Sequence, residues 1–473
     1  MRFSGQQLAY PVLKSGRVTE KDAVDWIVDA LTTQRFLPFV GAGVSSWTGA
    51  LHVANPEVAL SKMPAGLSSG KESIALARKI SLENGWLTQI RDGTLEFGTG
   101  WPPTWFLRLC MLALVEHEDR EACAPLPFSA LAQFLKSKDR SKKALAALLI
   151  TFFHKDGDEN GKPNNLHSLI AQLPCSYIVT TNYDFGLEEA SKNAPRPLVA
   201  VADDALMLSH GIEGRRLFKL HGDFRNVSAA EFLNGVPDED SLYNLRSERA
   251  DKILESIVFH EEAYWQFPGT RSEFGSRANL CGLISVLLPI SRVVFLGYGF
   301  NDPNIHEIFR HVGRRSSENP PLLVVTYKIS DAMEKFWMAR GVSVVEVGTL
   351  EGFLQTIRDS MWHGLGNESW RKSSGEVRDL HLAISIQRVL ESVVGHDRRA
   401  IVRKMIGLDR FSVEKAHENG FDLKKQDSLR ILSDLGCLQV VYPAKDGQPA
   451  FYAFDLDILN ALKEWSRYQG NTQ

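Results

Sequence analysis

The chain contains four short motifs, each of which directly follows an apolar run of the kind that forms a buried strand. In chain order they are Phe-Val-Gly-Ala-Gly-Val-Ser (residues 39–45), Thr-Thr-Asn-Tyr-Asp (180–184), Lys-Leu-His-Gly-Asp (219–223) and Leu-Gly-Tyr-Gly-Phe-Asn-Asp-Pro (296–303). The carboxyl ends of parallel strands meet at one edge of a sheet, and open α/β sheets bind their ligands at that edge. The pattern therefore predicts a parallel sheet that brings the four motifs together at a ligand-binding edge.

The spacing of apolar residues supports the same fold class along the chain. Residues 22–32 have helical spacing and lead into a buried-strand pattern at 36–40. From residue 177 onward, short apolar strands alternate with helices, which is typical of a doubly wound sheet buried on both faces. The expected strands are 177–180, 198–201, 217–220, 293–296, 322–326 and 342–347. We therefore expect a Rossmann-like α/β fold.

Large helical insertions are expected to interrupt this sheet. Residues 47–174 are mostly helical in pattern, with apolar spacing of the 3.6-residue type over 74–90, 105–118 and 128–154. A second, polar and acidic excursion is expected over 228–251. The first insertion follows the first glycine turn, so it is expected to lie over that turn.

A chain of 473 residues is too long for a single ordinary core. The polar stretch 364–376 lacks apolar periodicity, and we place a linker at 366–378 between a domain of residues 1–365 and a C-terminal domain of residues 379–473. In the latter, helical patterns near 380–394, 399–406 and 423–434 precede a hairpin at 437–442 and 450–454. This order predicts a small α+β winged-helix-like domain, a fold that contacts either DNA or protein.

Charge and cysteine content exclude several classes of protein. The formal net charge is only −3, so bulk electrostatics indicate neither a nucleic-acid nor a membrane partner. A signal-like N-terminus and a membrane-length apolar run are both lacking, which predicts a cytoplasmic protein. The five cysteines are scattered without a Cys-x-x-Cys pair, which predicts buried free thiols rather than disulfides or structural zinc.

The glycine turn at Gly41, Ala42 and Gly43 is suited to phosphate binding, because glycines allow close backbone approach and exposed amides receive an anion. Ser46 stands where the dinucleotide fingerprint has its third glycine. An interpretation in which the glycines serve turn geometry alone is equally open at this point.

The other motifs each offer a functional and a structural interpretation. Asp184 is explained as a cap of the following helix, which leaves Asn182 and both threonines without a role. Asn182 has the paired donor and acceptor needed to hold ribose hydroxyls or an attacking water. His221 lies at a strand's carboxyl end and would accept a proton from a ribose hydroxyl or from water, although a lone histidine is usually structural. Asp302 is explained as a helix cap.

Taken together and in this order, the four motifs resemble those of the sirtuin superfamily over residues 20 to about 355. The resemblance implies NAD binding. It assigns Gly41, Ala42, Gly43 and Ser45 to the pyrophosphate, Asn182 and Asp184 to the ribose and nicotinamide end, and the catalytic base to His221. Thr181 and the late turn of Gly297, Tyr298 and Gly299 complete the expected nucleotide-binding set.

The chain also departs from the deacylating sirtuins. Those enzymes carry a four-cysteine zinc ribbon after the His-Gly motif, whereas only Cys281 and Cys437 lie beyond His221 here. They also carry a Gly-Ile-Pro-x-Phe-Arg segment, where this chain reads Ser-Trp-Thr-Gly-Ala-Leu at 46–51. The second and fourth motifs are instead similar to those of zinc-free sirtuin-like enzymes of bacterial antiphage defence, which hydrolyse NAD.

This second resemblance implies an NAD+ glycohydrolase that yields nicotinamide and ADP-ribose without zinc or another metal, in an abortive-infection response. It also implies gating by homo-oligomerisation, a partner protein or a phage-derived trigger. The activating trigger, the oligomeric state and a linear or cyclic product are left open.

Three alternatives stay open from the sequence. One is a sensor that binds NAD or ADP-ribose without turnover, and another is a protein deacylase or ADP-ribosyltransferase. The third is a DNA-binding regulator that uses the C-terminal domain. Neighbouring acidic residues dilute the basic cluster of Arg398, Arg399, Arg403 and Lys404, which favours a solvated helix face, and protein contact over DNA contact.

Overall fold

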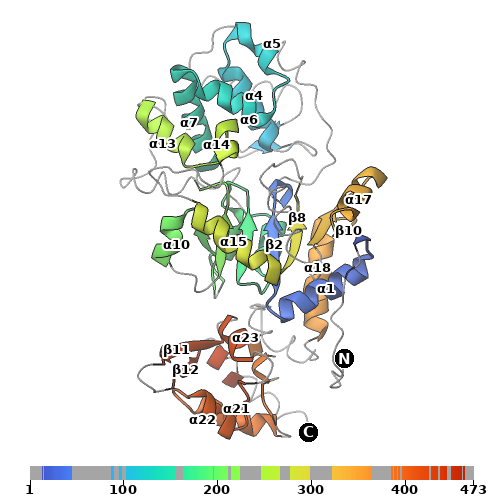
Figure 1. Ribbon diagram of the computed structural model, residues 1–473, viewed down its shortest axis with the longest axis vertical. Helices are drawn as coiled ribbons and strands as arrows, with labels where there is room; N and C mark the ends of the chain where they lie inside the picture. The colour runs from blue at the N-terminus through green and yellow to red at the C-terminus, as the bar shows by residue number, and fades with distance from the viewer. Residues whose placement is uncertain are drawn as a thin grey trace.

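The computed structural model describes residues 13, 15–44, 103–154, 163–194, 196–210, 215–223, 247–266, 277–298, 322–364 and most of 385–463, together with a short hairpin, β3 (Leu87–Gln89) with β4 (Leu95–Phe97). Ser45, Gly299, Asp302 and the predicted linker 366–378 lie outside the described residues. Figure 1 shows three tiers: a helical unit at one end, a sheet with its helices in the middle, and a C-terminal unit at the other end.

The middle tier is an eight-stranded sheet in which every pairing is parallel. Its order is β1-β10-β9-β8-β2-β5-β7-β6. The strands are β1 (Gly16–Arg17), β2 (Phe36–Val40), β5 (Tyr177–Thr180), β6 (Val199–Val201), β7 (Arg216–Lys219), β8 (Arg292–Leu296), β9 (Leu322–Thr326) and β10 (Val342–Glu346).

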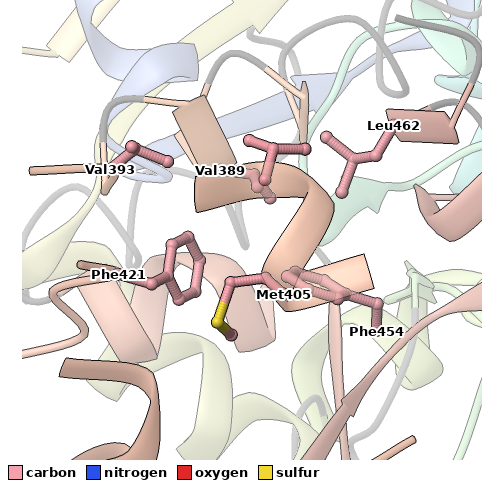
Figure 2. Close-up of a pocket in the computed structure, with 7 residues that line it drawn as sticks. Val389, Val393, Met405, Phe421, Phe454 and Leu462 are labelled. Atoms are coloured by element: carbon pink, nitrogen blue, oxygen red, sulfur yellow. The ribbon is translucent and has the colours of Figure 1, made fainter. Parts of the chain in front are cut away.

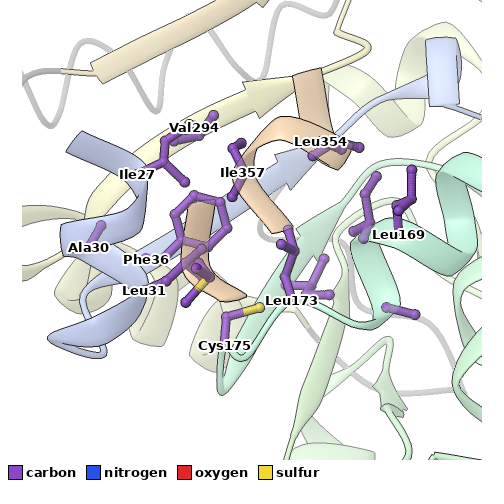
Figure 3. Packing of buried hydrophobic residues seen from close by; sticks show 14 of the residues in the cluster. Ile27, Ala30, Leu31, Phe36, Leu169, Leu173, Cys175, Val294, Leu354 and Ile357 are labelled. Atoms are coloured by element: carbon purple, nitrogen blue, oxygen red, sulfur yellow. The ribbon is translucent and has the colours of Figure 1, made fainter. Parts of the chain in front are cut away.

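Helices cover both faces of this sheet, as side-chain alternation in β2 shows. Phe36 and Val40 pack on one face with α1 (Glu20–Thr32), α8 (Asn165–Ala171), α9 (Gly186–Ser191) and α18 (Leu350–Gly364). Leu37 and Phe39 pack on the other face with α10 (Asp204–His210), α15 (Ala278–Ile290) and α17 (Asp331–Met338). Figure 3 shows α1, α8 and α18 meeting over the first face around Phe36 and Ile357. The predicted Rossmann-like α/β fold is confirmed.

The helical unit has its own apolar core and comes from two parts of the chain. The first part comprises α4 (Pro103–Leu114), α5 (Arg120–Cys123), α6 (Phe128–Lys136) and α7 (Asp139–His154). The second comprises α13 (Ser247–Glu255), which packs on α7, and α14 (Glu261–Gln266), which packs on α6. The described residues 103–154 of the predicted insertion are therefore helical, and a segment that begins at the end of the second excursion completes this unit. The helix expected over 74–90 is contradicted at 87–89, where the chain forms strand β3 of the hairpin.

A buried histidine joins the two parts of the helical unit. His260 is 3% exposed and precedes α14. The Lys136 ammonium donates to its Nε2 at 3.1 Å, and its Nδ1 lies 3.0 Å from Gln133 Oε1. Burial, together with the Lys136 charge, lowers the pKa of His260 to about 4. The ring is therefore neutral at physiological pH.

This pKa predicts that part of the stability is lost in mild acid. Because the pKa of this histidine is lower in the folded chain than in the unfolded chain, the unfolded chain takes up the proton first as the pH falls. The free energy of unfolding therefore has its full value above about pH 6.5 and decreases as the pH drops towards 4. We expect the pH-dependent loss to be on the order of 3 kcal/mol in wild type and largely absent in His260→Gln, because one pKa unit corresponds to about 1.36 kcal/mol.

Urea unfolding at several pH values between 4 and 7 measures this difference. His417→Gln is the matched control, because that imidazole is 63% exposed on α22 (Val413–Glu418). Parallel pH profiles for wild type and His260→Gln would contradict the prediction.

In the C-terminal unit, the elements bounded in the described residues after 397 are the helices α21 (Arg398–Ile406), α22 and α23 (Ser428–Asp434), followed by an antiparallel hairpin of β11 (Leu438–Tyr442) and β12 (Phe451–Phe454). The centre of this unit is a small apolar pocket with no space for a water molecule. Figure 2 shows Met405, Phe421 and Phe454 turned towards one another there, so this is a packed core and not a ligand site. α21, α23 and the hairpin lie where helices and strands were expected, whereas α22 was not expected, and the winged-helix assignment stays a prediction.

The C-terminal unit lies at the amino ends of the strands, away from the four motifs (Figure 1). Arg388 donates a hydrogen bond to the carbonyl oxygen of Thr32, the last residue of α1. Arg403 and Lys404, from the basic cluster, are exposed on α21.

All five cysteines are free thiols, four of them buried, as expected. In the described part of the chain, no helix is long and apolar enough to cross a bilayer.

Candidate functional site

The four predicted motifs follow four strands that are neighbours in the sheet, β8, β2, β5 and β7. The strands also end in register, because Val40 pairs with Leu296 on one side and with Thr180 on the other, and Thr180 pairs with Lys219. The central strand β2 has β5 on one side and β8 on the other, which places the first glycine turn where the chain's winding direction reverses. Such a switch point is where open α/β sheets bind ligands.

The first and fourth motifs interlock through their backbones. Gly41 N–H donates to the Leu296 carbonyl at 2.9 Å, and Gly43 N–H donates to the Gly297 carbonyl at 2.8 Å. A Cβ at Gly43 would lie 2.7 Å from the Gly297 oxygen, and Gly297 itself has φ +62°. These glycines are therefore required for the two turns to touch. Ala42 and Gly43 remain exposed at the surface of the edge.

The second motif is tied to both of these turns. Asn182 is 8% exposed, and its Nδ2 donates to the Gly41 carbonyl at 3.1 Å. Thr180 Oγ1 accepts the Asn182 N–H at 3.0 Å and donates to the Val40 carbonyl at 2.8 Å. The Thr181 hydroxyl lies 3.4 Å from the Tyr298 hydroxyl of the fourth motif. Both threonines had no role from the sequence alone; Thr180 holds Asn182 against the first turn, and Thr181 ties the same segment to the fourth motif.

Asp184 is held by a network that the sequence analysis did not identify. Its Oδ1 accepts the Gly186 N–H at 3.0 Å, so it bonds the first residue of α9, although Phe185 and not Asp184 stands at the N-cap position. His167 Nε2 lies 3.6 Å from the same oxygen. In a capping box at the start of α8, Asn164 N–H donates to His167 Nδ1 at 3.2 Å, so the imidazole proton is on Nε2 and faces Asp184.

The same capping box reaches the first turn, since Asn164 Nδ2 donates to the Val44 carbonyl at 2.8 Å. Burial lowers the pKa of His167, and the Asp184 carboxylate only partly opposes this. A neutral imidazole therefore supports Asp184. The sequence signal for this pair was Asn164 three residues before His167 at the start of an apolar helical run.

His221 lies where the sheet meets the helical unit. The residue is 3% exposed, and its ring is 5.3 Å from Tyr264, edge to face, and 6.1 Å from Tyr183, centroid to centroid. Its carbonyl accepts the Val258 N–H at 2.8 Å. The Tyr183 hydroxyl donates to the Val258 carbonyl, so both motif residues contact the same stretch of backbone.

Aromatic packing continues from this point into the helical unit. Phe259 packs edge to face against Tyr183, with centroids 5.9 Å apart, and against Phe128, with centroids 4.8 Å apart. Gly222, with φ +94°, forms a bridge with Ile257. The segment 257–264 therefore couples His221 to the helical unit. Sequence analysis missed it because its partners lie more than thirty residues away in the chain.

Comparison with protein-family models matches residues 176–345 to the SIR2-like domain. The matched range runs from the start of β5 to the end of β10 and includes Asn182 and His221. This part of the chain is similar to SIR2-like domains. The sirtuin resemblance of the motifs is thereby confirmed, although the first glycine turn, after β2, lies before the matched range.

The chain is also similar to a curated bacterial protein, Defense-associated sirtuin 2 of Bacillus subtilis. The two chains are 22% identical over 218 residues, which cover 45% of this chain and 18% of the relative. The match therefore spans less than a fifth of that relative's length.

The described residues offer no evident metal centre. Among them, no group of three or more His, Cys, Asp or Glu side chains lies close enough together to hold an ion. The expectation of a zinc-free site stays a prediction.

Proposed function

We propose that this protein is an NAD+ glycohydrolase that releases nicotinamide and ADP-ribose. The observation that carries the proposal is the convergence of the interlocked glycine turns, Asn182 and His221 at the carboxyl edge of a Rossmann-like sheet, part of which is similar to SIR2-like domains. Ligand binding at this edge follows from the general behaviour of open α/β sheets.

The first turn fits a pyrophosphate through its exposed backbone. The amides of Gly41, Gly43 and Val44 are used in hydrogen bonds within the protein. Among the described residues, the N–H of exposed Ala42 meets no acceptor. Ala42, rather than the glycines, is therefore the described residue whose amide we assign to the phosphate, while the glycines let the backbone approach it.

The chemistry demands little beyond positioning. Cationic nicotinamide is a good leaving group, so cleavage requires a ribose held in a productive geometry, stabilisation of the oxocarbenium-like transition state and an attacking water. We assign Asn182 to the ribose hydroxyls or the water, and His221 to the proton that hydroxyl or water gives up. Enclosure of His221 by two tyrosine rings limits solvent access around the base.

A defence role is proposed from the similarity to Defense-associated sirtuin 2. Unregulated NAD+ cleavage would exhaust the cell that makes the enzyme, so we propose that oligomerisation, a partner protein or a phage-derived trigger gates it. The helical unit, which contacts the segment beside His221, is the proposed site of that control.

We expect bacterial cells that express the full chain to lose most of their NAD+ after infection with a phage that activates it, with nicotinamide and ADP-ribose rising in equal amounts. Chromatography of cell extracts over an infection series measures this. NAD+ that stays at its uninfected level across a broad phage panel, combined with calorimetric binding of ADP-ribose by the purified chain, would contradict hydrolysis and support the sensor.

A further inference from the structure

A fully buried lysine lies between the second and third motifs. Lys219 is the last residue of β7, and its side chain is 0% exposed. Its ammonium donates to Glu188 Oε1 at 3.1 Å and lies 3.4 Å from Asp223 Oδ2. It also lies 4.5 Å from the centroid of the Phe185 ring. A buried ammonium needs partners of this kind, because desolvation of an unpaired charge costs several kcal/mol.

The remaining contacts of this ammonium are to backbone. It donates to the Asp184 carbonyl at 2.9 Å and to the Tyr183 carbonyl at 3.3 Å. These two peptide groups directly follow Asn182, while Asp223 stands two residues after His221. One ammonium group therefore fixes the loop that carries Asn182 relative to the turn that carries His221.

The electrostatic environment keeps this group charged. Burial alone lowers the pKa of Lys219, but the carboxylates of Asp223, Glu188 and Asp184 outweigh that effect and raise it. The side chain is therefore a charged ammonium at physiological pH. A group that keeps its charge in this way holds the surrounding groups in place and does not act as a proton donor.

We propose that Lys219 is a positioning residue, whose buried ammonium sets the relative placement of Asn182 and His221. The inference rests on the proposed function, since those residues are its proposed catalytic pair. Small displacements of catalytic groups are costly, because a shift of about 1 Å lowers a rate by roughly a hundredfold.

The test separates positioning from stability by neutralising the whole buried cluster. Lys219→Met alone leaves two buried carboxylates without a counter-charge and is expected to lower the melting temperature strongly. The triple variant Lys219→Met, Glu188→Gln, Asp223→Asn removes all three charges and keeps similar side-chain shapes. Lys192→Met is the control, because Lys192 is 70% exposed and pairs with Glu189 of the neighbouring helix α9.

We expect the triple variant to regain most of the melting temperature lost by Lys219→Met. Its kcat for nicotinamide release should stay roughly 10- to 100-fold below that of wild type, with KM changed by less than about threefold. If Lys219 contributed to stability alone, kcat would return to the wild-type value together with the melting temperature. A triple variant with wild-type kcat would therefore overturn the proposal.

A second readout does not depend on catalysis. Amide hydrogen exchange, followed by mass spectrometry, should be at least about tenfold faster in the triple variant than in wild type over residues 181–185 and 220–223. Unchanged exchange in these two segments would overturn the role of Lys219. Absence of NAD+ cleavage by wild type would instead reject the proposed function, and exchange would still decide the positioning role.

Discussion

Replacing His221 with alanine is expected to lower nicotinamide release by roughly 10²- to 10⁴-fold, the contribution typical of a general base. The expected loss is in kcat, because the imidazole is assigned to proton transfer in the transition state and not to holding the nucleotide. Steady-state rates with NAD+, measured on the activated full chain, test this. His221→Gln should be equally impaired, since it keeps a hydrogen-bonding side chain but has no titratable base.

The control for this experiment is His417→Ala, which removes an exposed imidazole from the C-terminal unit and should leave the rate unchanged. Because His221 is buried between two tyrosines, thermal unfolding of each variant must accompany the kinetics. A folded His221→Ala variant that cleaves NAD+ at the wild-type rate would remove His221 from the mechanism.

Gly297→Ala is expected to cause a large loss of stability for the addition of a single methyl group. The left-handed backbone, φ +62°, costs an alanine about 1–2 kcal/mol. The new Cβ would also lie 2.7 Å from the Val44 nitrogen and 2.9 Å from the Gly43 carbonyl carbon. Separating the two turns to relieve that clash adds about 1–3 kcal/mol. Urea unfolding of wild type and variant measures the sum.

Gly341→Ala isolates the first of these two costs. Gly341 has a similar φ of +72°, but a Cβ there meets no heavy atom within 4 Å. We expect this variant to lose only the backbone part, about 1–2 kcal/mol. Equal losses in both variants would show that the two glycine turns tolerate separation, and would contradict their description as interlocked.

Much of this fold was predictable from sequence because buried strands and amphipathic helices leave strong local patterns. β2 is apolar at every position, and β5, β8 and β9 each contain a run of three or four apolar residues followed by threonine or glycine. The convergence of the motifs then followed from the geometry of parallel sheets. β1, with two residues, has no such local pattern and is defined only by its pairing with β10.

The supporting residues of the site were not predictable, because their partners are distant in sequence. Lys219 belongs to a recognised motif, yet only its place in a strand buried on both faces indicated that the ammonium had to find carboxylates. The role of Tyr183 depends on Val258, and that of Asn164 on Val44. Local patterns identified the groups proposed for chemistry, whereas long-range packing determines what holds them in place.

The central position of β2 has a consequence for synthesis of the chain. Among the four strands that the motifs follow, this one is made first, but β8, which begins at Arg292, follows about 250 residues later. At ordinary translation rates, the apolar strand β2 therefore lacks its partner β8 along one edge for on the order of tens of seconds. An unpaired apolar edge invites pairing with other nascent chains. Expression from this gene should therefore benefit from chaperones that bind extended segments and from slow, cool induction.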